Sequence, residues 1–309
     1  MIGNSEIAIS VVIVSYNVKD LVATCINTLY QFLPSHLSIE IILVDNNSKD
    51  NTVDFIKDKF PKVIVIHNNY NAGFPAANNQ AFKIAKGKYI FMLNPDTEFL
   101  DDSLNKLYQK LQSDTSISLI APMLLNTDKT RQLSVWRFQS IWSIFCETHY
   151  LRFLLGHKNY SDKDLLKPFE AECFSGAAIL LKKDLINKIG DLDESMFWIE
   201  DTEFCYRAYH AGFKLLYYPD AKLIHHVGQS AKTNYNISVS NQIYNKIKFF
   251  KKHHSTVSWI IVMLLSFYHV VLKLIVFGLL APLNKTYYRK AKAYWYTLPR
   301  VFNPPIGMN

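Results

Sequence analysis

The chain has 309 residues, of which 49% are hydrophobic and 14% aromatic, so it can bury a large core and is not a disordered protein. Its four cysteines are scattered without paired spacing, which argues against a disulfide framework or structural zinc and indicates a reducing compartment. The net charge of +8 is uneven: residues 221–309 contain twelve Lys and Arg and no Asp or Glu, whereas the first 220 residues hold 22 basic and 26 acidic side chains.

Apolar runs of strand length alternate with helically spaced segments through the first 120 residues. Because the strand runs have few polar interruptions, we expect both of their faces to be buried, and the alternating order predicts a mostly parallel central sheet flanked by helices. The predicted strands are 7–15, 39–45, 63–67, 89–94 and 117–121, and the predicted helices are 18–33, 51–60, 76–85 and 102–111.

The pattern weakens after residue 122. Residues 131–164 are aromatic and mixed in charge, and we interpret them as a loop with a helix on the acceptor side of a binding site. The later predicted elements are strands 173–181, 214–218 and 222–226, helices 184–189 and 199–211, a basic helix 236–254 and an apolar run 257–280.

Polar residues follow four of the predicted strands. They are Ser15-Tyr16-Asn17, Asp45-Asn46-Asn47-Ser48, Asn68-Asn69-Tyr70-Asn71 and Asn94-Pro95-Asp96. Each cluster alone is also typical of turns and helix N-termini, but ligands bind at the carboxyl ends of strands in open α/β sheets, so four clusters predict a polar crevice. The sequence has neither GxGxxG nor GxxxxGK[ST], so a nucleotide in this crevice must be held without a glycine loop.

Two carboxylates suit a nucleotide in such a crevice. Asp45 can accept a hydrogen bond from a base N–H. A diphosphate also needs positive charge, most simply a divalent cation held by a carboxylate, and Asp96 on the loop after a buried strand is the candidate.

Three acids, Glu200, Asp201 and Glu203, stand at the start of predicted helix 199–211. The helix dipole favours one or two acids there, and Glu203 can pair with Arg207 four residues on. The dipole does not explain the aromatic and apolar residues around them. Partial desolvation raises the pKa of a carboxylate in such surroundings, which suits a general base.

Two adjacent histidines, His225 and His226, end the last predicted strand. Side chains of neighbouring strand residues point to opposite faces, so at most one of the two faces the crevice. At this point a metal-binding role and a structural role for that histidine are equally open.

Seven motifs in a fixed order carry a resemblance to a known family. They are VVIVSYN (11–17), ILVDNNSKD (42–50), NAGFPAANN (71–79), FMLNPD (91–96), FSGAAILLKK (174–183), GDLDESMFWIEDTEFCYRAYHAG (190–212) and PDAKLIH (219–225). Over about residues 9–230 the chain resembles the family 2 glycosyltransferases of the GT-A fold, and among these the rhamnosyltransferase-like branch.

The resemblance implies a role for each matching residue. The implied donor-binding residues are Ser15, Tyr16, Asn17, Asp45, Asn71, Asn94 and Asp96. Asp96 stands at the last acid of the family's DxD motif and Asn94 at its first position, so a site for Mg²⁺ or Mn²⁺ has one carboxylate, which His225 can complement. Asp201 matches the catalytic base, with Glu200 beside it in the same acidic motif.

We therefore expect an inverting, metal-dependent glycosyltransferase of the GT-A type. Its donor is expected to be dTDP-L-rhamnose or a UDP-sugar, and its acceptor a hydroxyl of a lipid-linked saccharide or polysaccharide of the cell surface. Two alternatives stay open: a polyprenyl-phosphate glycosyl synthase, whose ionised acceptor needs no base, and a non-catalytic subunit that binds sugar nucleotide or lipid. No nucleic-acid motif accompanies the basic tail.

The predicted catalytic domain is 1–235, with a nucleotide-binding half to about residue 125 and an acceptor half from 126, and a helical membrane-associating region follows at 236–309. The 24 residues 257–280 are long enough to cross about 30 Å of hydrocarbon. However, Ser266, His269 and Lys273 form a polar stripe, which favours monotopic attachment over a single span, with basic flanks on anionic lipid. A buried core helix is the third interpretation. Because Met1–Ser10 is no signal peptide, we expect the cytoplasmic face of the membrane.

Overall fold

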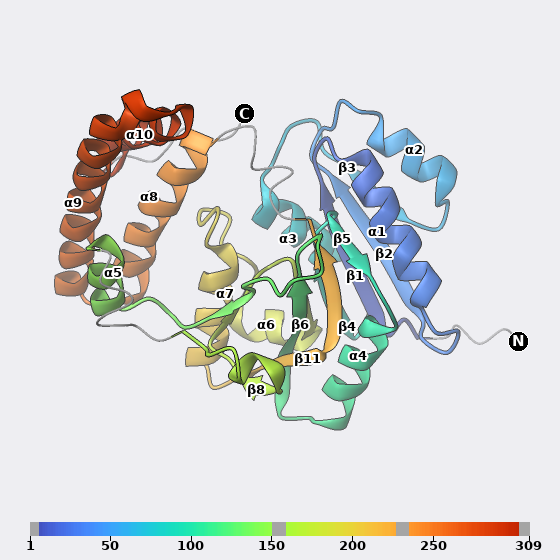
Figure 1. Ribbon diagram of the computed structural model, residues 1–309. Helices are drawn as coiled ribbons and strands as arrows, with labels where there is room; N and C mark the ends of the chain where they lie inside the picture. The colour runs from blue at the N-terminus through green and yellow to red at the C-terminus, as the bar shows by residue number, and fades with distance from the viewer. Residues whose placement is uncertain (1–5, 150–158, 227–234, 303–309) are drawn as a thin grey trace, which may run out of the picture. The chain divides into compact units, whose positions relative to one another are not determined.

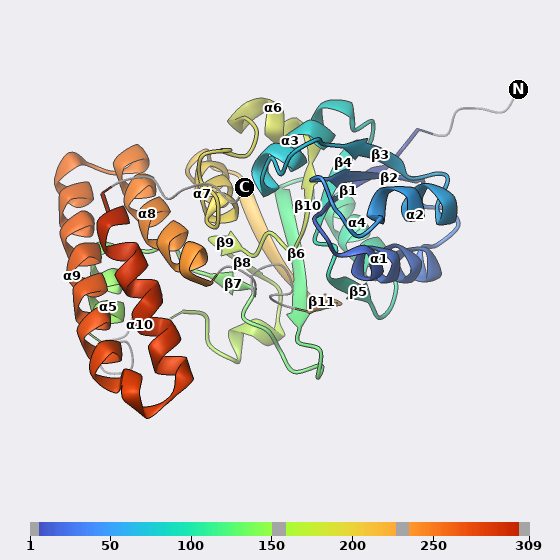
Figure 2. The ribbon, with the colours of Figure 1, turned by 90° about the horizontal axis from the view of Figure 1, so that it is seen from above.

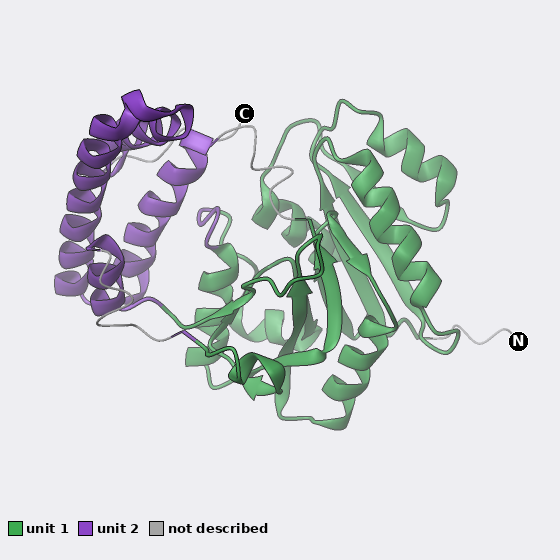
Figure 3. Cartoon of the chain, in the orientation of Figure 1, with its two compact units in different colours: residues 1–138, 160–194, 200–230 green, residues 139–159, 195–199, 231–309 purple. Residues whose placement is uncertain are grey.

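The computed structural model describes residues 6–149, 159–226 and 235–302, and the chain divides into two compact units. Unit 1 comprises residues 1–138, 160–194 and 200–230, and unit 2 comprises residues 139–159, 195–199 and 231–309 (Figure 3). The change of unit after residue 230 lies near the predicted boundary at 235, but two short segments, 139–159 and 195–199, group with the C-terminal helices. The assignment of catalysis to residues 1–235 stays a prediction.

The centre of unit 1, in the part of the chain that the structure describes, is a nine-stranded sheet (Figure 1). Its strand order is β3-β2-β1-β4-β10-β6-β11-β5, and β8 also pairs with β11. The strands are β1 Ile9–Ser15, β2 Ile39–Asp45, β3 Ile64–His67, β4 Tyr89–Leu93, β5 Thr97–Phe99, β6 Ile117–Leu125, β8 Phe169–Glu170, β10 Ala178–Lys182 and β11 Lys214–His225. A separate pair consists of β7 Val135–Trp136 and β9 Cys173–Phe174.

Helices of unit 1 cover both faces of this sheet. They are α1 Lys19–Phe32, α2 Thr52–Lys59, α3 Phe74–Ile84, α4 Ser103–Ser113, α6 Lys183–Ile189 and α7 Glu200–His210, with a short 3-10 helix at Asp164–Leu166. Each longer helix buries residues three or four positions apart, as α1 does with Val22, Ile26 and Leu29.

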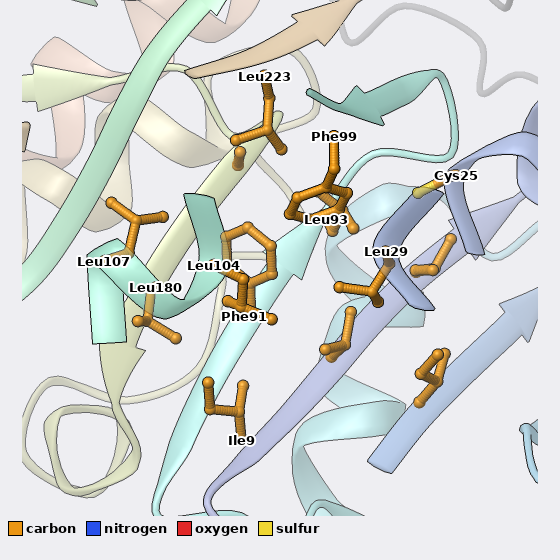
Figure 4. Packing of buried hydrophobic residues seen from close by; sticks show 14 of the residues in the cluster. Ile9, Cys25, Leu29, Phe91, Leu93, Phe99, Leu104, Leu107, Leu180 and Leu223 are labelled. Atoms are coloured by element: carbon orange, nitrogen blue, oxygen red, sulfur yellow. The ribbon is translucent and has the colours of Figure 1, made fainter. Parts of the chain in front are cut away.

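Two hydrophobic clusters, one on each face of the sheet, form the core of unit 1. Alternate residues of a strand face opposite sides, so Val11 and Ile13 of β1 pack in one cluster while Val12 and Val14 pack in the other. The first cluster also contains apolar residues of α1, α2 and α4 (Figure 4), and the second contains residues of α3, α6 and α7. Burial on both faces explains why the strands read as continuous apolar runs.

The predicted α/β class is confirmed: β1, β2, β3, β4, β6 and β11 run in the same direction, and the sheet is mixed because β5, β8 and β10 run the opposite way. Parallel pairing holds for β1 with β2 and β4, for β2 with β3 and for β6 with β11, whereas β10 runs antiparallel between β4 and β6. The short strands β5 and β8 are also antiparallel to β11. An apolar run reads the same in either direction, so the sequence could not show this reversal.

Two predicted boundaries differ from the structure. The predicted strand 173–181 is divided by residues 175–177 into β9, which pairs with β7 outside the central sheet, and β10, which lies within it. The predicted strands 214–218 and 222–226 form one strand, β11, whose pairing with β6 is irregular between Tyr218 and Lys222. The irregularity lies at Pro219, which has no N–H to donate to a neighbouring strand.

Unit 2 is helical, with α5 at Ile141–Thr148, α8 at Tyr235–His253, α9 at Thr256–Leu280 and α10 at Lys285–Thr297. Short 3-10 helices follow at Ala281–Leu283 and Leu298–Arg300. Figure 2 shows α8, α9 and α10 side by side, and Ile243, Ile247, Val270 and Val301 pack between them. The sequence did not predict α10, and residues 150–158 of the predicted acceptor loop lie outside the described residues.

Opposite faces of α9 differ in an unexpected way. Its buried residues, Val262, Ser266, Val270 and Lys273, form one stripe that includes two of the predicted polar positions. The outward residues are apolar and large: Val257, Ile260, Ile261, Leu264, Phe267, Tyr268, Ile275 and Leu279 are all exposed. The polar stripe therefore faces the other helices of unit 2, whereas most of the apolar face is exposed, apart from contacts of Tyr268 with His149 and of Phe267 with Phe302.

Candidate active site

A buried carboxylate lies at the carboxyl ends of β1 and β2, where Ser15 and Asp45 are paired. Asp45 Oδ1 accepts hydrogen bonds from Ser15 Oγ at 2.9 Å and Ser48 Oγ at 2.5 Å, and Oδ2 accepts one from Ser48 N at 2.9 Å. His67 Nε2 lies 3.8 Å from Oδ2. Because each oxygen has two lone pairs, Oδ2 is the atom that can accept a further hydrogen bond, although the Asp45 side chain is 0% exposed in this structure.

The neighbouring turns carry the other predicted donor-binding residues. Asn17 has a left-handed φ of 55°, its N–H donates to Ser48 Oγ at 2.9 Å, and its Oδ1 accepts from Lys49 N at 2.6 Å. Asn71 Oδ1 accepts from Gly73 N at 3.0 Å, and Tyr16 is 41% exposed. These contacts fix the turns at the edge of the sheet, and the donor-binding roles stay predictions.

The structure brings Asn94, Asp96 and His225 together, although they are distant in sequence. His225 ends β11 and is paired with Thr97 of β5, just beyond Asp96. Its Nε2 lies 3.3 Å from Asp96 Oδ1 and 3.4 Å from Asn94 Nδ2. The side chains of His225 and Asp96 are 11% and 12% exposed, so this group is buried but still reaches the surface.

This donor set fits a divalent cation that is shared with a substrate. A carboxylate oxygen and an imidazole nitrogen that face each other are two suitable ligands, and Mg²⁺ in phosphate-transfer sites keeps waters and substrate phosphates as its other ligands. Within the described residues, no group of three or more His, Cys, Asp or Glu side chains could hold a metal. Asp96 and His225 would therefore hold the ion together with the donor diphosphate.

His226 has a different environment from His225. Its Nε2 lies 2.8 Å from Glu98 Oε1 and its Nδ1 lies 2.8 Å from Thr127 Oγ1, so both ring nitrogens are engaged by the protein. Gln132 Oε1 lies 2.8 Å from His225 Nδ1. The sequence does not predict these roles of Glu98, Thr127 and Gln132, because each is more than 90 residues from its histidine and no local pattern marks it.

Asp201 lies in the first turn of α7 and is half-buried. Gly176 N donates to its Oδ2 at 2.9 Å and Thr202 N donates to its Oδ1 at 2.6 Å. Burial raises the pKa of Asp201 above the ordinary 3.8, although these two N–H groups act in the opposite direction. A Cβ at residue 176 would lie 3.3 Å from the Asp201 Cβ, so a glycine allows this close approach.

The other two acids of the motif have different surroundings. Glu203 is fully buried, and both of its oxygens accept from Arg207 Nε, at 3.0 and 2.9 Å. Arg207 also donates to Asp191 O at 2.7 Å, so this ion pair anchors the loop between α6 and α7. Glu200 is half-buried, and its catalytic role stays a prediction.

Asp201 and the Asn94–Asp96–His225 group lie on either side of one short segment. Gly176 N–H binds Asp201, and the next residue, Ala177, accepts a hydrogen bond through its carbonyl from Asn94 N at 2.8 Å. Strands β1, β2, β4, β6 and β11 all end at this edge of the sheet. The predicted base and the predicted metal ligands are thus at the same edge as Asp45.

The chain is similar in sequence to several known proteins. The family model described as "Glycosyl transferase family 2" matches residues 10–190. Poly(ribitol-phosphate) beta-glucosyltransferase of Bacillus spizizenii is 36% identical over 116 residues, 35% of this chain and 18% of that protein. UDP-Glc:alpha-D-GlcNAc-diphosphoundecaprenol beta-1,3-glucosyltransferase of Escherichia coli is 44% identical over 90 residues, 28% of this chain and 35% of that protein.

A more distant relative matches a longer part of the chain. N-acetylglucosaminyl-diphospho-decaprenol L-rhamnosyltransferase of Mycobacterium tuberculosis is 22% identical over 218 residues, 64% of this chain and 70% of that protein. The two bacterial glucosyltransferases are matched over only 18% and 35% of their own length.

Two solved structures share the fold. GalNAc-T7 with UDP, GalNAc and Mn²⁺ has a TM-score of 0.58 at 18% identity, covering 80% of this chain and 50% of that chain. The mannosyltransferase PcManGT of Pyrobaculum calidifontis with GDP-Man and Mn²⁺ has a TM-score of 0.56 at 15% identity, covering 95% and 85%. At these identities the likeness concerns the fold, and it confirms the predicted GT-A type.

Proposed function

Because the chain belongs to glycosyl transferase family 2, we propose that it moves a sugar from a nucleoside-diphosphate donor to an acceptor hydroxyl with inversion at the anomeric carbon. The observation that carries this proposal is the position of Asp201, a carboxylate with a raised pKa. It accepts a hydrogen bond from Gly176 N, and the carbonyl of the next residue, Ala177, accepts one from Asn94 N of the Asn94–Asp96–His225 group. A base and a diphosphate site at one edge of a sheet are the two requirements of such a transfer.

Asp201 acts as the general base in this proposal. Its carboxylate accepts the proton of the acceptor hydroxyl while that oxygen attacks the anomeric carbon from the side opposite the leaving diphosphate. The N–H groups of Gly176 and Thr202 hold the carboxylate in one orientation, so little reorganisation is needed when the acceptor arrives. A single displacement inverts the anomeric configuration.

The donor lies along the carboxyl ends of β1, β2 and β4. Asp45 Oδ2 accepts from the base, while Ser15, Tyr16, Asn17 and Asn71 line the nucleotide side of the crevice. Asp96 and His225 hold Mg²⁺ or Mn²⁺, which supplies positive charge for the departing diphosphate. Both solved structures contain Mn²⁺, which supports a divalent cation in a site of this fold.

We assign the donor to the dTDP- and UDP-sugars, with dTDP-L-rhamnose suggested by the resemblance to the rhamnosyltransferase-like branch. The named relatives include an L-rhamnosyltransferase and a glucosyltransferase that uses UDP-Glc. Two of them act on sugars carried by a polyprenyl diphosphate. This supports an acceptor that is a lipid-linked saccharide or a growing cell-surface polysaccharide.

A lipid-linked acceptor requires the enzyme to work at a membrane, and unit 2 has suitable chemistry. Thr256–Leu283 is the one described helix that is long and apolar enough to cross a membrane, although a core helix of a soluble protein passes the same test. Only 22% of the most apolar 18-residue stretch of this helix is buried, which argues against a core helix. Lys285, Arg289 and Lys292 of the neighbouring α10 are exposed, so the packed unit suits the lipid surface better than its interior.

Binding of a panel of nucleotide sugars to the full-length protein, with Mn²⁺ or with chelator, tests the proposal directly. We expect Mn²⁺-dependent binding of one dTDP- or UDP-sugar and a product of inverted anomeric configuration by NMR. Transfer to polyprenyl phosphate, but to no saccharide hydroxyl, would instead identify a polyprenyl-phosphate glycosyl synthase. Binding without any transfer would identify a non-catalytic subunit.

A further inference from the structure

The amide of Gln132 is held rigidly beside the predicted metal ligands. Gln132 follows a tight turn at the end of β6, where Asn126 N donates to Thr130 O at 2.8 Å and Lys129 has a left-handed φ of 63°. The backbone N–H of Gln132 donates to Leu124 O at 2.9 Å. The backbone of the turn therefore fixes where the side chain begins.

The contacts of the Gln132 side chain determine which end of its amide faces His225. Its Nε2 donates to the backbone carbonyl of His225 at 3.0 Å and to Asn126 Oδ1 at 3.0 Å. A backbone carbonyl only accepts, so the NH₂ group must point there and both of its hydrogens are used. The remaining atom, Oε1, then lies 2.8 Å from His225 Nδ1.

This orientation sets the tautomer of His225. A carbonyl oxygen cannot donate, so the hydrogen in that contact belongs to Nδ1, and in the neutral ring Nε2 then carries a lone pair. Nε2 is the atom that faces Asp96 Oδ1 at 3.3 Å and Asn94 Nδ2 at 3.4 Å. In the other tautomer a hydrogen would occupy the position from which a metal is bound.

We propose that Gln132 is a positioning residue that holds His225 in the Nδ1–H tautomer, so that Nε2 is ready to bind a divalent cation together with Asp96. The inference rests on the metal site of the proposed function. Partners that accept from the second nitrogen of a metal-binding histidine typically change metal affinity 10–100-fold when they are mutated. His226 is the contrast, since Glu98 and Thr127 engage both of its nitrogens.

Mn²⁺ titration of the full-length protein, followed by calorimetry and by the electron paramagnetic resonance of free Mn²⁺, tests this role without any turnover. Gln132→Met keeps the length of the side chain but removes the acceptor, and we expect it to bind Mn²⁺ roughly 10–100-fold more weakly. Gln132→Glu keeps an acceptor for Nδ1–H and should stay within a few fold of the wild type. Thr127→Val, which removes the matching contact of His226, should leave Mn²⁺ affinity unchanged.

The imidazole ¹⁵N resonances of His225 provide a second readout, recorded without metal at a pH above the ordinary histidine pKa. We expect a protonated Nδ1 in the wild type and in Gln132→Glu, and a mixture of tautomers in Gln132→Met. If Asp96→Ala loses Mn²⁺ binding while Gln132→Met binds Mn²⁺ as tightly as the wild type does, the proposed role of Gln132 is wrong and the proposed metal site is retained. A wild-type protein that binds no Mn²⁺, either alone or with a nucleoside diphosphate present, overturns both.

Discussion

At the scale of single residues, the surroundings of Asp201 separate it from the other acids of its motif. Glu203 is fully buried and its two oxygens are used by Arg207, so it cannot accept a proton from a substrate without breaking that ion pair. Asp201 accepts hydrogen bonds from the N–H groups of Gly176 and Thr202 and from the Thr202 hydroxyl, with no cation among these partners, and it remains partly exposed. A carboxylate that is fixed but not paired with a cation can act as a base.

Asp201→Asn should therefore remove sugar transfer while donor binding changes little. The amide keeps the shape of the side chain but does not accept a proton, and the loss of a general base typically slows turnover ~10²–10⁴-fold. Turnover and donor affinity are measured on the same preparation. Asp184→Asn, in the first turn of α6 and exposed, is the matched control and should retain activity. Transfer by the Asp201 variant at the wild-type rate would refute the assignment of the base.

The raised pKa of Asp201 also predicts a pH dependence. The base must be ionised, and its pKa in the folded protein lies above 3.8, so the transfer rate should fall as the pH decreases through that raised pKa. The residual rate of Asp201→Asn should not show this acidic limb. A pH–rate profile of both proteins, at pH values where both remain folded by circular dichroism, checks the prediction. The same limb in both proteins would assign it to another group.

Asp96→Ala should make the binding of a nucleoside diphosphate independent of Mn²⁺. The substitution removes the one carboxylate that faces His225 Nε2, and the cation is the proposed link between the protein and the diphosphate. Calorimetry with Mn²⁺ and with chelator should give two different affinities in the wild type and one in the variant. Equal affinities in the wild type would contradict the metal site.

At the scale of elements, β11 carries two histidines with different partners. His226 joins Glu98 of β5 to Thr127 in the turn after β6, so His226→Ala should lower the free energy of unfolding by about 1–3 kcal/mol. His225→Ala should weaken Mn²⁺ binding more than His226→Ala does. Thermal melting and Mn²⁺ titration of both variants separate the two effects. Equal losses of Mn²⁺ affinity that follow the melting temperature would show that both histidines are structural.

The longer elements were predicted well from the sequence, because the burial of one or both faces of a long strand or helix gives its apolar residues a regular spacing. Strand β2 matches its prediction residue for residue, and the ends of β1 and α1 differ by at most two residues. Strand β5 has only three residues, too few to show an alternating pattern, and it exists because it pairs with β11. The reversal of β10 between β4 and β6 is likewise decided by long-range pairing.

The candidate site was predicted in part for the same reason. Asp45 ends β2, Asp96 follows β4 and Asp201 is in the first turn of α7, so their places at the ends of periodic elements could be inferred from the sequence. Gln132 follows β6 in a segment without periodicity, and its contact with His225 spans 93 positions. Such a contact depends on the three-dimensional path of the turn at 126–131, which no local pattern encodes.

At the scale of the whole molecule, the basic C-terminal region is a helical unit with one strongly apolar face. The sequence suggested that the stripe of Ser266, His269 and Lys273 favours an interfacial helix, because a helix surrounded by lipid rarely tolerates polar groups unless they face protein or water. The structure changes this argument, because Ser266 and Lys273 are buried within unit 2 and the opposite, apolar face of α9 is exposed. In the proposed attachment to a membrane, this apolar face would contact the acyl chains and the exposed basic residues of α10 would meet the headgroups.

Charged substitutions on the outer face of α9 should therefore release the full-length protein from vesicles that contain anionic lipid. Leu264 and Leu279 are 58% and 76% exposed, so Leu264→Asp and Leu279→Asp should fold normally. Each removes one large apolar side chain from the lipid contact, which is worth about 1.5–3 kcal/mol, or roughly a ten- to hundredfold loss of binding in vesicle flotation. Leu166→Asp, at an equally exposed leucine of unit 1, is the matched control and should float as the wild type does. If both α9 variants unfold instead, α9 is a core helix, and if neither variant changes flotation, this face does not contact lipid.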